Sequence, residues 1–187
     1  MTGAAVLVTG ASTGIGRATA LLLHERGFTV YAGVRRPEDG ASLRAAASDR
    51  LVPLIIDVTD PEAIAAAAGE ITRAGVALVG LVNNAGIAAA APLEFVPLAD
   101  FRHQLEVNVV GQLAVTQAML PLLREDRGRI VNITSVAGLF AGPMLGPYHA
   151  SKWALEAMTD TMRMELAPWG IRVSAVEPGQ IATPIWS

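Results

Sequence analysis

The stretch that decides the fold is Ala4-Ala5-Val6-Leu7-Val8-Thr9-Gly10-Ala11-Ser12-Thr13-Gly14-Ile15-Gly16. An apolar run gives way to three glycines, and helix-forming residues follow from Arg17 onward. This order predicts a buried strand, a tight turn and a helix. Glycines let backbone N–H groups approach a phosphate closely, and a helix N-terminus adds a favourable dipole. The stretch therefore predicts a turn that binds a dinucleotide.

Two other interpretations of this turn are weaker. The glycine spacing is G-x-x-x-G-x-G, and a Walker A loop is excluded because no Gly-Lys-Ser/Thr follows. Gly10-Ala11-Ser12-Thr13-Gly14 also matches the G-x-S-x-G elbow of hydrolases. That class needs an oxyanion loop from an earlier strand, and we expect none before this first strand. Labelling by a serine-reactive fluorophosphonate would distinguish a hydrolase.

A second signal is the stretch Tyr148-His149-Ala150-Ser151-Lys152. On a helix, the four-residue spacing places Tyr148 and Lys152 on one face. An ammonium beside a phenol stabilises the phenolate, so we expect Lys152 to lower the pKa of Tyr148. A tyrosine with such a pKa exchanges a proton near neutral pH. Alone, the pair is also compatible with a solvated helix face.

The rest of the chain alternates apolar strands with helices, which predicts an α/β fold with a parallel sheet and helices on both faces. The strands are expected near 4–9, 28–34, 51–57, 78–83, 129–134 and 171–176. The helices are expected near 14–26, 41–48, 61–74, 98–123 and 148–167. No linker or repeat interrupts the pattern, so residues 1–187 are predicted to form a single domain.

Several motifs occur together in a fixed order: the glycine-rich turn, Asn83-Asn84-Ala85-Gly86, Asn108, Ser135, Tyr148-x-x-x-Lys152 and Pro178-Gly179. In this combination the chain resembles the short-chain dehydrogenase/reductase family over essentially its whole length. The resemblance implies a Rossmann-type doubly wound fold. It also implies an oxidoreductase that transfers a hydride between a nicotinamide dinucleotide and an alcohol or carbonyl compound.

The resemblance implies four catalytic residues. Tyr148 is expected to be the acid/base, and Lys152 to lower its pKa and bind the nicotinamide ribose. Ser135 is expected to hold the substrate oxygen, and Asn108 to position a water in a proton relay. Without the resemblance, Ser135 is equally well explained as a capping serine and Asn108 as a mid-helix polar residue that bonds backbone.

The same resemblance implies a set of cofactor contacts. Besides Tyr148 and Lys152, they are Gly10, Ser12, Thr13, Gly14, Ile15, Gly16, Asp57, Val58, Asn84, Ala85, Gly86, Pro178, Gly179, Ile181 and Thr183. Asn83 is expected beside the adenosine ribose with Ala85 and Gly86. Asp57 has a second interpretation, as the cap of the helix that begins near Pro61. Pro178-Gly179 is also compatible with an ordinary turn.

The cofactor is expected to be NADP(H) rather than NAD(H). The second strand ends in Arg35-Arg36, where an enzyme that uses NAD usually has Asp or Glu to bond the ribose 2′-hydroxyl. A guanidinium suits the 2′-phosphate of NADP through charge-assisted bonds. Solvated loop charges are the alternative explanation for these two arginines.

Composition excludes several other functions. The net charge of −3 argues against nucleic acid as the main partner. The absence of cysteine excludes disulfide and thiolate chemistry, and the three histidines lack the spacing of metal ligands, so no metal is expected. No signal peptide is evident, because the N-terminus lacks a basic region and leads directly into the first expected strand. No membrane span is expected, because Gly and Pro interrupt the uncharged stretch 130–151. A cytoplasmic protein is expected.

The family pattern usually continues several dozen residues beyond Pro178-Gly179, so we expect the C-terminal substrate segment to be missing here. If so, strand 171–176 becomes an open sheet edge. The apolar stretch 138–145 favours a hydrophobic alcohol or ketone as substrate. A catalytically weak dinucleotide-binding scaffold or sensor is the alternative function.

A homo-oligomer, dimer or tetramer, is also expected. On the predicted last helix, Trp153, Ala157 and Met164 lie opposite the face that carries Tyr148 and Lys152. Apolar residues on that outer face would be covered by another subunit.

Overall fold

The computed structural model describes residues 3–186 and contains one six-stranded sheet. The strands are β1 (Ala4–Val8), β2 (Thr29–Val34), β3 (Leu51–Ile55), β4 (Ala77–Asn83), β5 (Arg129–Ile133) and β6 (Arg172–Val176). Their order is β3-β2-β1-β4-β5-β6, and all neighbouring pairs are parallel. This is the strand order of the doubly wound dinucleotide-binding fold, so the predicted fold class is confirmed.

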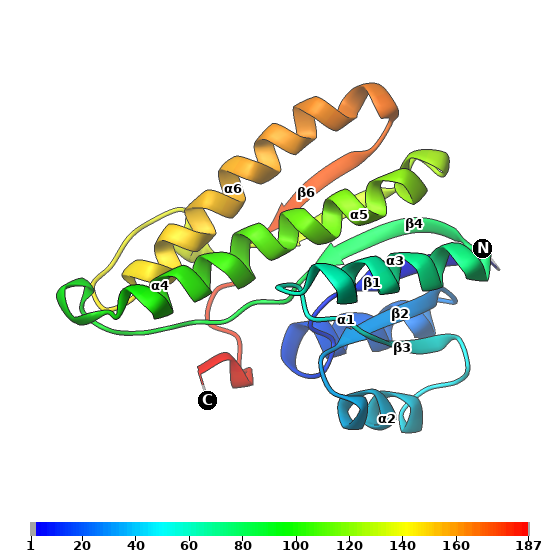
Figure 1. Cartoon of the computed structure of the whole chain (residues 1–187), viewed down its shortest axis with the longest axis horizontal. Coiled ribbons are helices and arrows are strands. Elements are labelled where there is room, and N and C mark those ends of the chain that lie inside the picture. Colours follow the sequence, from blue (N-terminus) through cyan, green and yellow to red (C-terminus); the bar gives the residue numbers. More distant parts are fainter. Residues whose placement is uncertain (1–2, 187) are drawn as a thin grey trace.

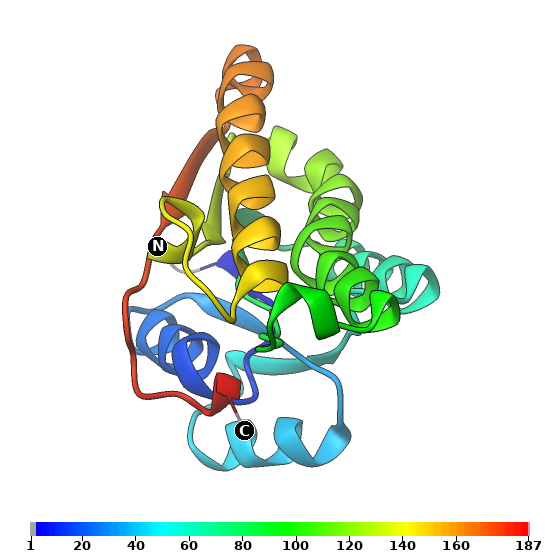
Figure 2. The same ribbon diagram turned by 90° about the vertical axis from the view of Figure 1, so that its left-hand side faces the viewer.

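Helices cover both faces of the sheet, as Figures 1 and 2 show. The longer helices are α1 (Gly14–Glu25), α2 (Pro37–Ala45), α3 (Pro61–Ala74), α5 (Gly111–Glu125) and α6 (Gly146–Leu166). Successive residues of β1 point to opposite faces: Leu7 belongs to the core cluster beneath α3, α5 and α6, and Val8 to the one beneath α1 and α2. Strands buried on both faces explain the high share of apolar residues.

The helix expected at 41–48 begins earlier and ends earlier, because α2 spans Pro37–Ala45. Pro37 occupies the first turn, where its missing N–H costs no hydrogen bond and its fixed φ suits a helix. Glu38 and Asp39 in the same turn favour the positive end of the helix dipole. The apolar pattern missed this polar first turn.

The single helix expected at 98–123 is interrupted. It consists of α4 (Leu98–Leu105), a π-helical turn η2 (Glu106–Val110) and α5. A π turn inserts one extra residue into the helical ladder, a change that the sequence periodicity does not reveal. Asn108 lies in this turn, which directs its side chain toward Ile87 on a neighbouring segment.

Short 3₁₀ turns complete the chain: η1 (Leu93–Phe95), η3 (Val136–Gly138), η4 (Ala167–Trp169) and η5 (Pro184–Trp186). Helix α6 is oriented as predicted, because Tyr148 and Lys152 are buried while Trp153 and Met164 are exposed. Strand β6 forms one edge of the sheet. Within residues 3–186, no helix is long and apolar enough to cross a membrane.

Replacing Gly16 by Ala is expected to lower the free energy of unfolding by about 1–3 kcal/mol. Gly16 lies where α1 crosses the preceding turn, and an added methyl group would stand 2.9 Å from the carbonyl carbon of Gly10. That backbone must shift to make room. Chemical denaturation measures the change.

Gly69→Ala is the matched control, because Gly69 lies inside α3 and an added methyl group there meets nothing within 4 Å. Removing a glycine from a helix interior should stabilise the protein by about 0.5–1 kcal/mol. A Gly16→Ala variant as stable as the wild type would show that the backbone at Gly10 can move to accommodate the methyl group at no cost in stability.

Candidate active site

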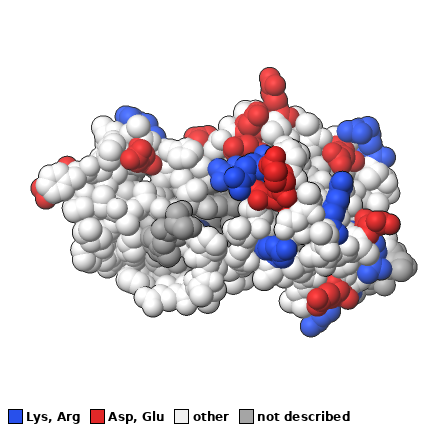
Figure 3. All heavy atoms as spheres, turned by 90° about the horizontal axis from the view of Figure 1, so that it is seen from below, with Lys and Arg blue, Asp and Glu red and all other residues white. Residues whose placement is uncertain are grey.

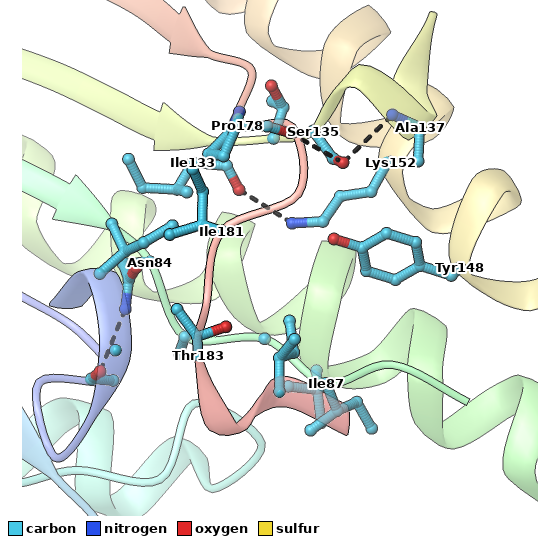
Figure 4. A pocket seen from close by; sticks show the side chains of 18 of the residues that line it. Asn84, Ile87, Ile133, Ser135, Ala137, Tyr148, Lys152, Pro178, Ile181 and Thr183 are labelled. Atoms are coloured by element: carbon cyan, nitrogen blue, oxygen red, sulfur yellow. Dashed lines mark hydrogen bonds between the residues drawn. The ribbon is translucent and has the colours of Figure 1, made fainter. Parts of the chain in front are cut away.

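A cavity of about 920 Å³ opens at the carboxyl ends of the strands, where β1 lies between β2 and β4. Ligands of doubly wound sheets bind at this reversal of strand order. The wall is formed by the turns that follow β1 to β5, by the first turns of α6, and by residues 178–185. Figure 4 shows these segments converging on one space.

The glycine-rich turn forms one side of the cavity. Gly10, Ser12, Thr13, Gly14 and Ile15 line it, whereas Gly16 packs behind the turn. Gly10 has φ +64°, and a methyl group there would approach the Cα of Ala85 to 2.8 Å, so only glycine fits.

The side chain of Asn84 braces this turn. Its Nδ2 donates to the carbonyl oxygens of Thr9 (2.9 Å) and Gly10 (3.0 Å). In return, the hydroxyl oxygen of Thr9 accepts from the backbone N–H groups of Asn84 (2.9 Å) and Ala85 (3.0 Å). Asn84 also lines the cavity with Ala85 and Gly86, but its side-chain amide donates to the glycine-rich turn. The bracing role of Thr9 was not anticipated from the sequence.

The start of α1 fits an anionic group. Thr13 makes no side-chain capping hydrogen bond, and among the described residues of the first turn none is acidic. The first N–H groups of a helix have no partner inside the helix, and here the turn that precedes them lines the cavity. Such an end, with close backbone approach at Gly10, suits the pyrophosphate of a dinucleotide.

The two arginines after β2 differ in position. Arg35 lines the cavity, whereas Arg36 lies outside it and pairs with Asp39 at 3.2 Å. The Arg36 side chain is 74% exposed. Only Arg35 is therefore placed for contact with a ligand in the cavity, and the expectation for Arg36 does not match its position.

Asp57 and Val58 line the cavity after β3. The Asp57 carboxylate accepts hydrogen bonds from the backbone N–H (2.9 Å) and hydroxyl (2.7 Å) of Thr59. These bonds hold the pKa of Asp57 below its usual value, with a smaller contribution from Arg35. The alternative role of Asp57 as a helix cap is wrong, because Asp60 caps α3.

Ser135 both caps a turn and faces the cavity. Its hydroxyl accepts from the N–H of Ala137 at 3.1 Å, at the start of η3, and donates to the carbonyl of Pro178 at 3.4 Å. The N–H of Val136 donates to the same carbonyl at 3.1 Å. The Pro178-Gly179 turn is thereby fixed against the end of β5, rather than being a free surface turn.

Tyr148 and Lys152 lie on one face of α6, and both line the cavity. Figure 4 shows the Tyr148 hydroxyl directed toward the Lys152 ammonium, whose Nζ lies 5.6 Å from the centre of the tyrosine ring. Lys152 is the only lysine in the sequence. Its Nζ donates to the carbonyl of Ile133 at 2.8 Å.

The expected lowering of the Tyr148 pKa is wrong. Burial raises the pKa of Tyr148 more than its hydrogen bond with Ser135 lowers it. Burial also lowers the pKa of Lys152 to about 8, against the opposing charge of Glu156. Burial is therefore the largest influence on the pKa of both groups, and the four-residue spacing of the pair does not reveal how deeply they are buried.

Asn108 lies behind the cavity wall and is fully buried. Its Oδ1 accepts from the N–H of Ile87 (2.9 Å), and its Nδ2 donates to the Ile87 carbonyl (2.9 Å) and to the hydroxyl of Ser151 (3.0 Å). The Ser151 hydroxyl in turn donates to the Tyr148 carbonyl at 2.8 Å. Asn108 thus connects the wall at Ile87 to the helix that carries Tyr148.

The remaining expected contacts are placed as follows. Ile181 and Thr183 line the cavity, and Thr183 packs beside Gly14, so the C-terminal segment crosses in front of the glycine-rich turn (Figure 4). Asn83 does not line it. The Asn83 amide is buried and donates to Thr116 (2.8 Å) and Asn132 (2.9 Å) beneath the sheet.

Two histidines on helices, His103 and His149, also line the cavity, a position that the sequence did not predict. His149 is only 5% exposed. Its position next to Tyr148 is the one signal in the sequence that could have indicated this. Among residues 3–186, no cluster of His, Cys, Asp and Glu is arranged to hold a metal ion.

Known proteins share this sequence and fold. A family model described as short chain dehydrogenase matches residues 4–187. Retinol dehydrogenase 5 of Mus musculus is 44% identical over 183 residues, which cover 96% of this chain and 57% of that protein. The 3-amino-tetrahydro-pyrrolizinone reductase of Xenorhabdus hominickii is 44% identical over 190 residues, covering 100% of this chain and 64% of that protein.

Solved structures agree. A short-chain dehydrogenase from Streptomyces avermitilis has a TM-score of 0.93 at 38% identity, covering 100% of this chain and 69% of that one. One from Burkholderia cenocepacia, in complex with NADP, has a TM-score of 0.86 at 36% identity, covering 98% and 75%. The chain belongs to the short chain dehydrogenase family of oxidoreductases. It spans 57–64% of the length of the two relatives named above.

Proposed function

We propose that this protein transfers a hydride between NADP(H) and an apolar alcohol or carbonyl compound, with Tyr148 as the acid/base. The observation that carries the proposal is that one cavity brings Ser135, Tyr148 and Lys152 together with the glycine-rich turn. A protein that only binds a dinucleotide has no need of a buried phenol and ammonium side by side.

The residues of this chain would have different roles in the reaction. A nicotinamide dinucleotide, when bound, supplies or accepts the hydride. Tyr148 gives its hydroxyl proton to the substrate oxygen during reduction and takes it back during oxidation. The buried Lys152 ammonium stabilises the phenolate that forms, and the Ser135 hydroxyl orients the substrate oxygen. Asn108 positions this wall through Ile87 and Ser151.

An apolar substrate is supported by the other side of the cavity, where Ile87, Val136, Phe140, Pro143 and Leu145 form the wall. Figure 3 shows the surface of the molecule seen from below relative to Figure 1. Charged side chains gather mainly over the half of this surface that carries α1 to α3, while the half toward α4 is largely uncharged. Burial of apolar ligand surface against such a wall contributes about 25 cal/mol per Å².

A panel of apolar ketones, aldehydes and alcohols tests the proposal. Each is incubated with the full chain and NADPH or NADH, and the change in nicotinamide absorbance is followed. Turnover of at least one compound is expected. Tight cofactor binding without turnover of any compound would instead support the scaffold or sensor.

Arg35→Asp is expected to weaken NADPH binding by roughly ten- to hundredfold while sparing NADH. A charge-assisted bond from a guanidinium to the 2′-phosphate contributes about 1.5–3 kcal/mol. Fluorescence titration with both cofactors measures the change.

Arg36→Asp is the matched control, since Arg36 lies outside the cavity at the start of α2, where Asp is itself a favourable cap. Its cofactor affinities should equal those of the wild type. Equal binding of NADPH and NADH by the wild type, unchanged in Arg35→Asp, would contradict the proposed preference.

We also propose a homo-oligomer in which another copy covers the exposed face of α6. Trp153 is 51% and Met164 71% exposed on that face. Sedimentation at micromolar concentration should show a dimer or larger species, and Trp153→Glu should shift it toward monomer. A wild-type monomer under these conditions would contradict the idea.

A further inference from the structure

His149 is held by hydrogen bonds at both ring nitrogens. It follows Tyr148 on α6, and its ring lies between that helix and residues 139–145, the η3–α6 loop. The Nδ1 atom lies 2.8 Å from the carbonyl oxygen of Ala137, and the N–H of Gly142 donates to Nε2 at 3.1 Å. The ring also meets Phe140 edge-on, with ring centres 5.6 Å apart.

These two partners fix the form of the ring. A carbonyl oxygen only accepts, so Nδ1 must carry a hydrogen and donate to Ala137. A backbone N–H only donates, so Nε2 must be bare and accept from Gly142. Both bonds are satisfied together only by the neutral Nδ1–H tautomer. His149 therefore joins a fixed point in η3 to a point in the middle of the loop.

The loop so held forms the apolar wall of the cavity. Phe140, Gly142, Pro143 and Leu145 all line it. At its far end the carbonyl of Met144 accepts from the N–H of Ala91 at 2.7 Å. Met144 has φ +72°, a left-handed conformation that a non-glycine residue keeps only where its surroundings enforce it. Between η3 and Met144, two hydrogen bonds tie the loop to α6: Trp153 Nε1 donates to the Phe140 carbonyl at 3.4 Å, and the shorter bond runs from the Gly142 N–H to His149 in the middle of the loop.

We propose that His149 is a positioning residue that shapes the substrate side of the cavity by clamping the η3–α6 loop to the catalytic helix. Its contact with Gly142 sets where the wall of Phe140, Pro143 and Leu145 stands relative to Tyr148. The effect on substrate affinity rests on the proposed function. The clamp, meaning the hydrogen bonds of His149 to Gly142 and Ala137, does not.

Three substitutions separate the two bonds. In His149→Gln the longer side chain carries its amide oxygen to the place of Nε2, so it can still accept from Gly142. In His149→Asn the shorter amide reaches only the place of Nδ1, so the bond to Ala137 is kept and the clamp is lost. His149→Leu loses both bonds.

The expected result is a rise in the substrate KM of about two- to tenfold for His149→Asn and His149→Leu, the worth of about one hydrogen bond. His149→Gln should stay close to the wild-type KM, and the NADPH Kd should be unchanged in all three. A structural defect would instead change KM, kcat and NADPH binding together. The substrate is the most rapidly turned over compound of the panel described above.

Hydrogen exchange of the Gly142 amide tests the clamp without any turnover. Protection should be lost in the Asn and Leu variants and kept in the Gln variant. His24→Asn is the control, because His24 also accepts a backbone N–H, that of Ser48 at 3.3 Å, but does not line the cavity. It should leave KM and Gly142 exchange unchanged.

A measurement on the wild type covers the case in which the variants fail to fold. Long-range ¹H–¹⁵N correlation of the His149 ring should show the Nδ1–H tautomer at neutral pH. An Nε2–H tautomer would overturn the proposal, and so would unchanged Gly142 exchange in His149→Leu. Failure of the whole substrate panel would contradict the proposed function alone, since tautomer and exchange still decide the clamp.

Discussion

Replacing Tyr148 by Phe is expected to lower turnover by about 10²–10⁴-fold while leaving NADPH affinity within about twofold of the wild type. The substitution removes the hydroxyl that faces Lys152 and keeps the ring, which lines the cavity. Steady-state kinetics and fluorescence titration measure the two quantities. Tyr31→Phe is the matched control, because Tyr31 is the other tyrosine and is buried in the core beneath α3 and α5.

The pH dependence follows from the direction of the Tyr148 pKa. Because burial raises this pKa, the phenol keeps its proton across the neutral range. Carbonyl reduction needs the protonated phenol and also the Lys152 ammonium, whose pKa burial lowers to about 8, so it should begin to fall near pH 8 and fall further as the pH passes the raised pKa of Tyr148. Alcohol oxidation, which needs the phenolate, should rise over the same range. A Phe variant that kept most of its activity, with the same pH profile, would show that another group moves the proton.

Lys152→Met is expected to abolish turnover and yet to stabilise the folded protein at neutral pH. The folded-state pKa of about 8, against 10.5 for a free lysine, means that the buried charge costs roughly 3 kcal/mol below pH 8. Methionine removes this cost but also the bond to Ile133, which offsets about 1 kcal/mol. The net gain is about 2 kcal/mol, measurable by urea denaturation.

The stability advantage of Lys152→Met over the wild type depends on pH, and it is lost between about pH 8 and pH 10.5. Between pH 8 and 10.5 the unfolded wild type binds more protons than the folded wild type, so its stability rises with pH. The advantage of Lys152→Met should therefore shrink through this window. Lys152→Arg, which keeps a charge in the same place, should show no gain. A Met variant less stable than the wild type at neutral pH, by an amount that is constant with pH, would contradict this account.

The sequence predicted the parts of the site that depend on local spacing. The apolar run before Gly10 predicted β1, and the glycines predicted the turn that now lines the cavity. The four-residue interval predicted that Tyr148 and Lys152 share one face of α6. Each of these features is set by residues a few positions apart, whose geometry follows from a single element.

What the sequence did not predict depends on contacts between distant segments. Nothing local distinguishes Arg35 from Arg36, because the direction of each side chain is set by how α2 leaves the sheet. The direction of the Tyr148 pKa required knowledge of its burial. The role of His149 required the η3–α6 loop to return over α6, and the π turn at Asn108 required the partner segment at Ile87.

Because Lys152 is the only lysine, every other permanently charged basic side chain of this sequence is arginine. Acetylation within this stretch, whether enzymatic or by an acid anhydride, could reach only one side-chain amine, and it would neutralise the group that faces Tyr148. Reductive methylation with ¹³C-formaldehyde would likewise give a single side-chain resonance. That resonance would report from within the cavity whether a ligand protects the amine.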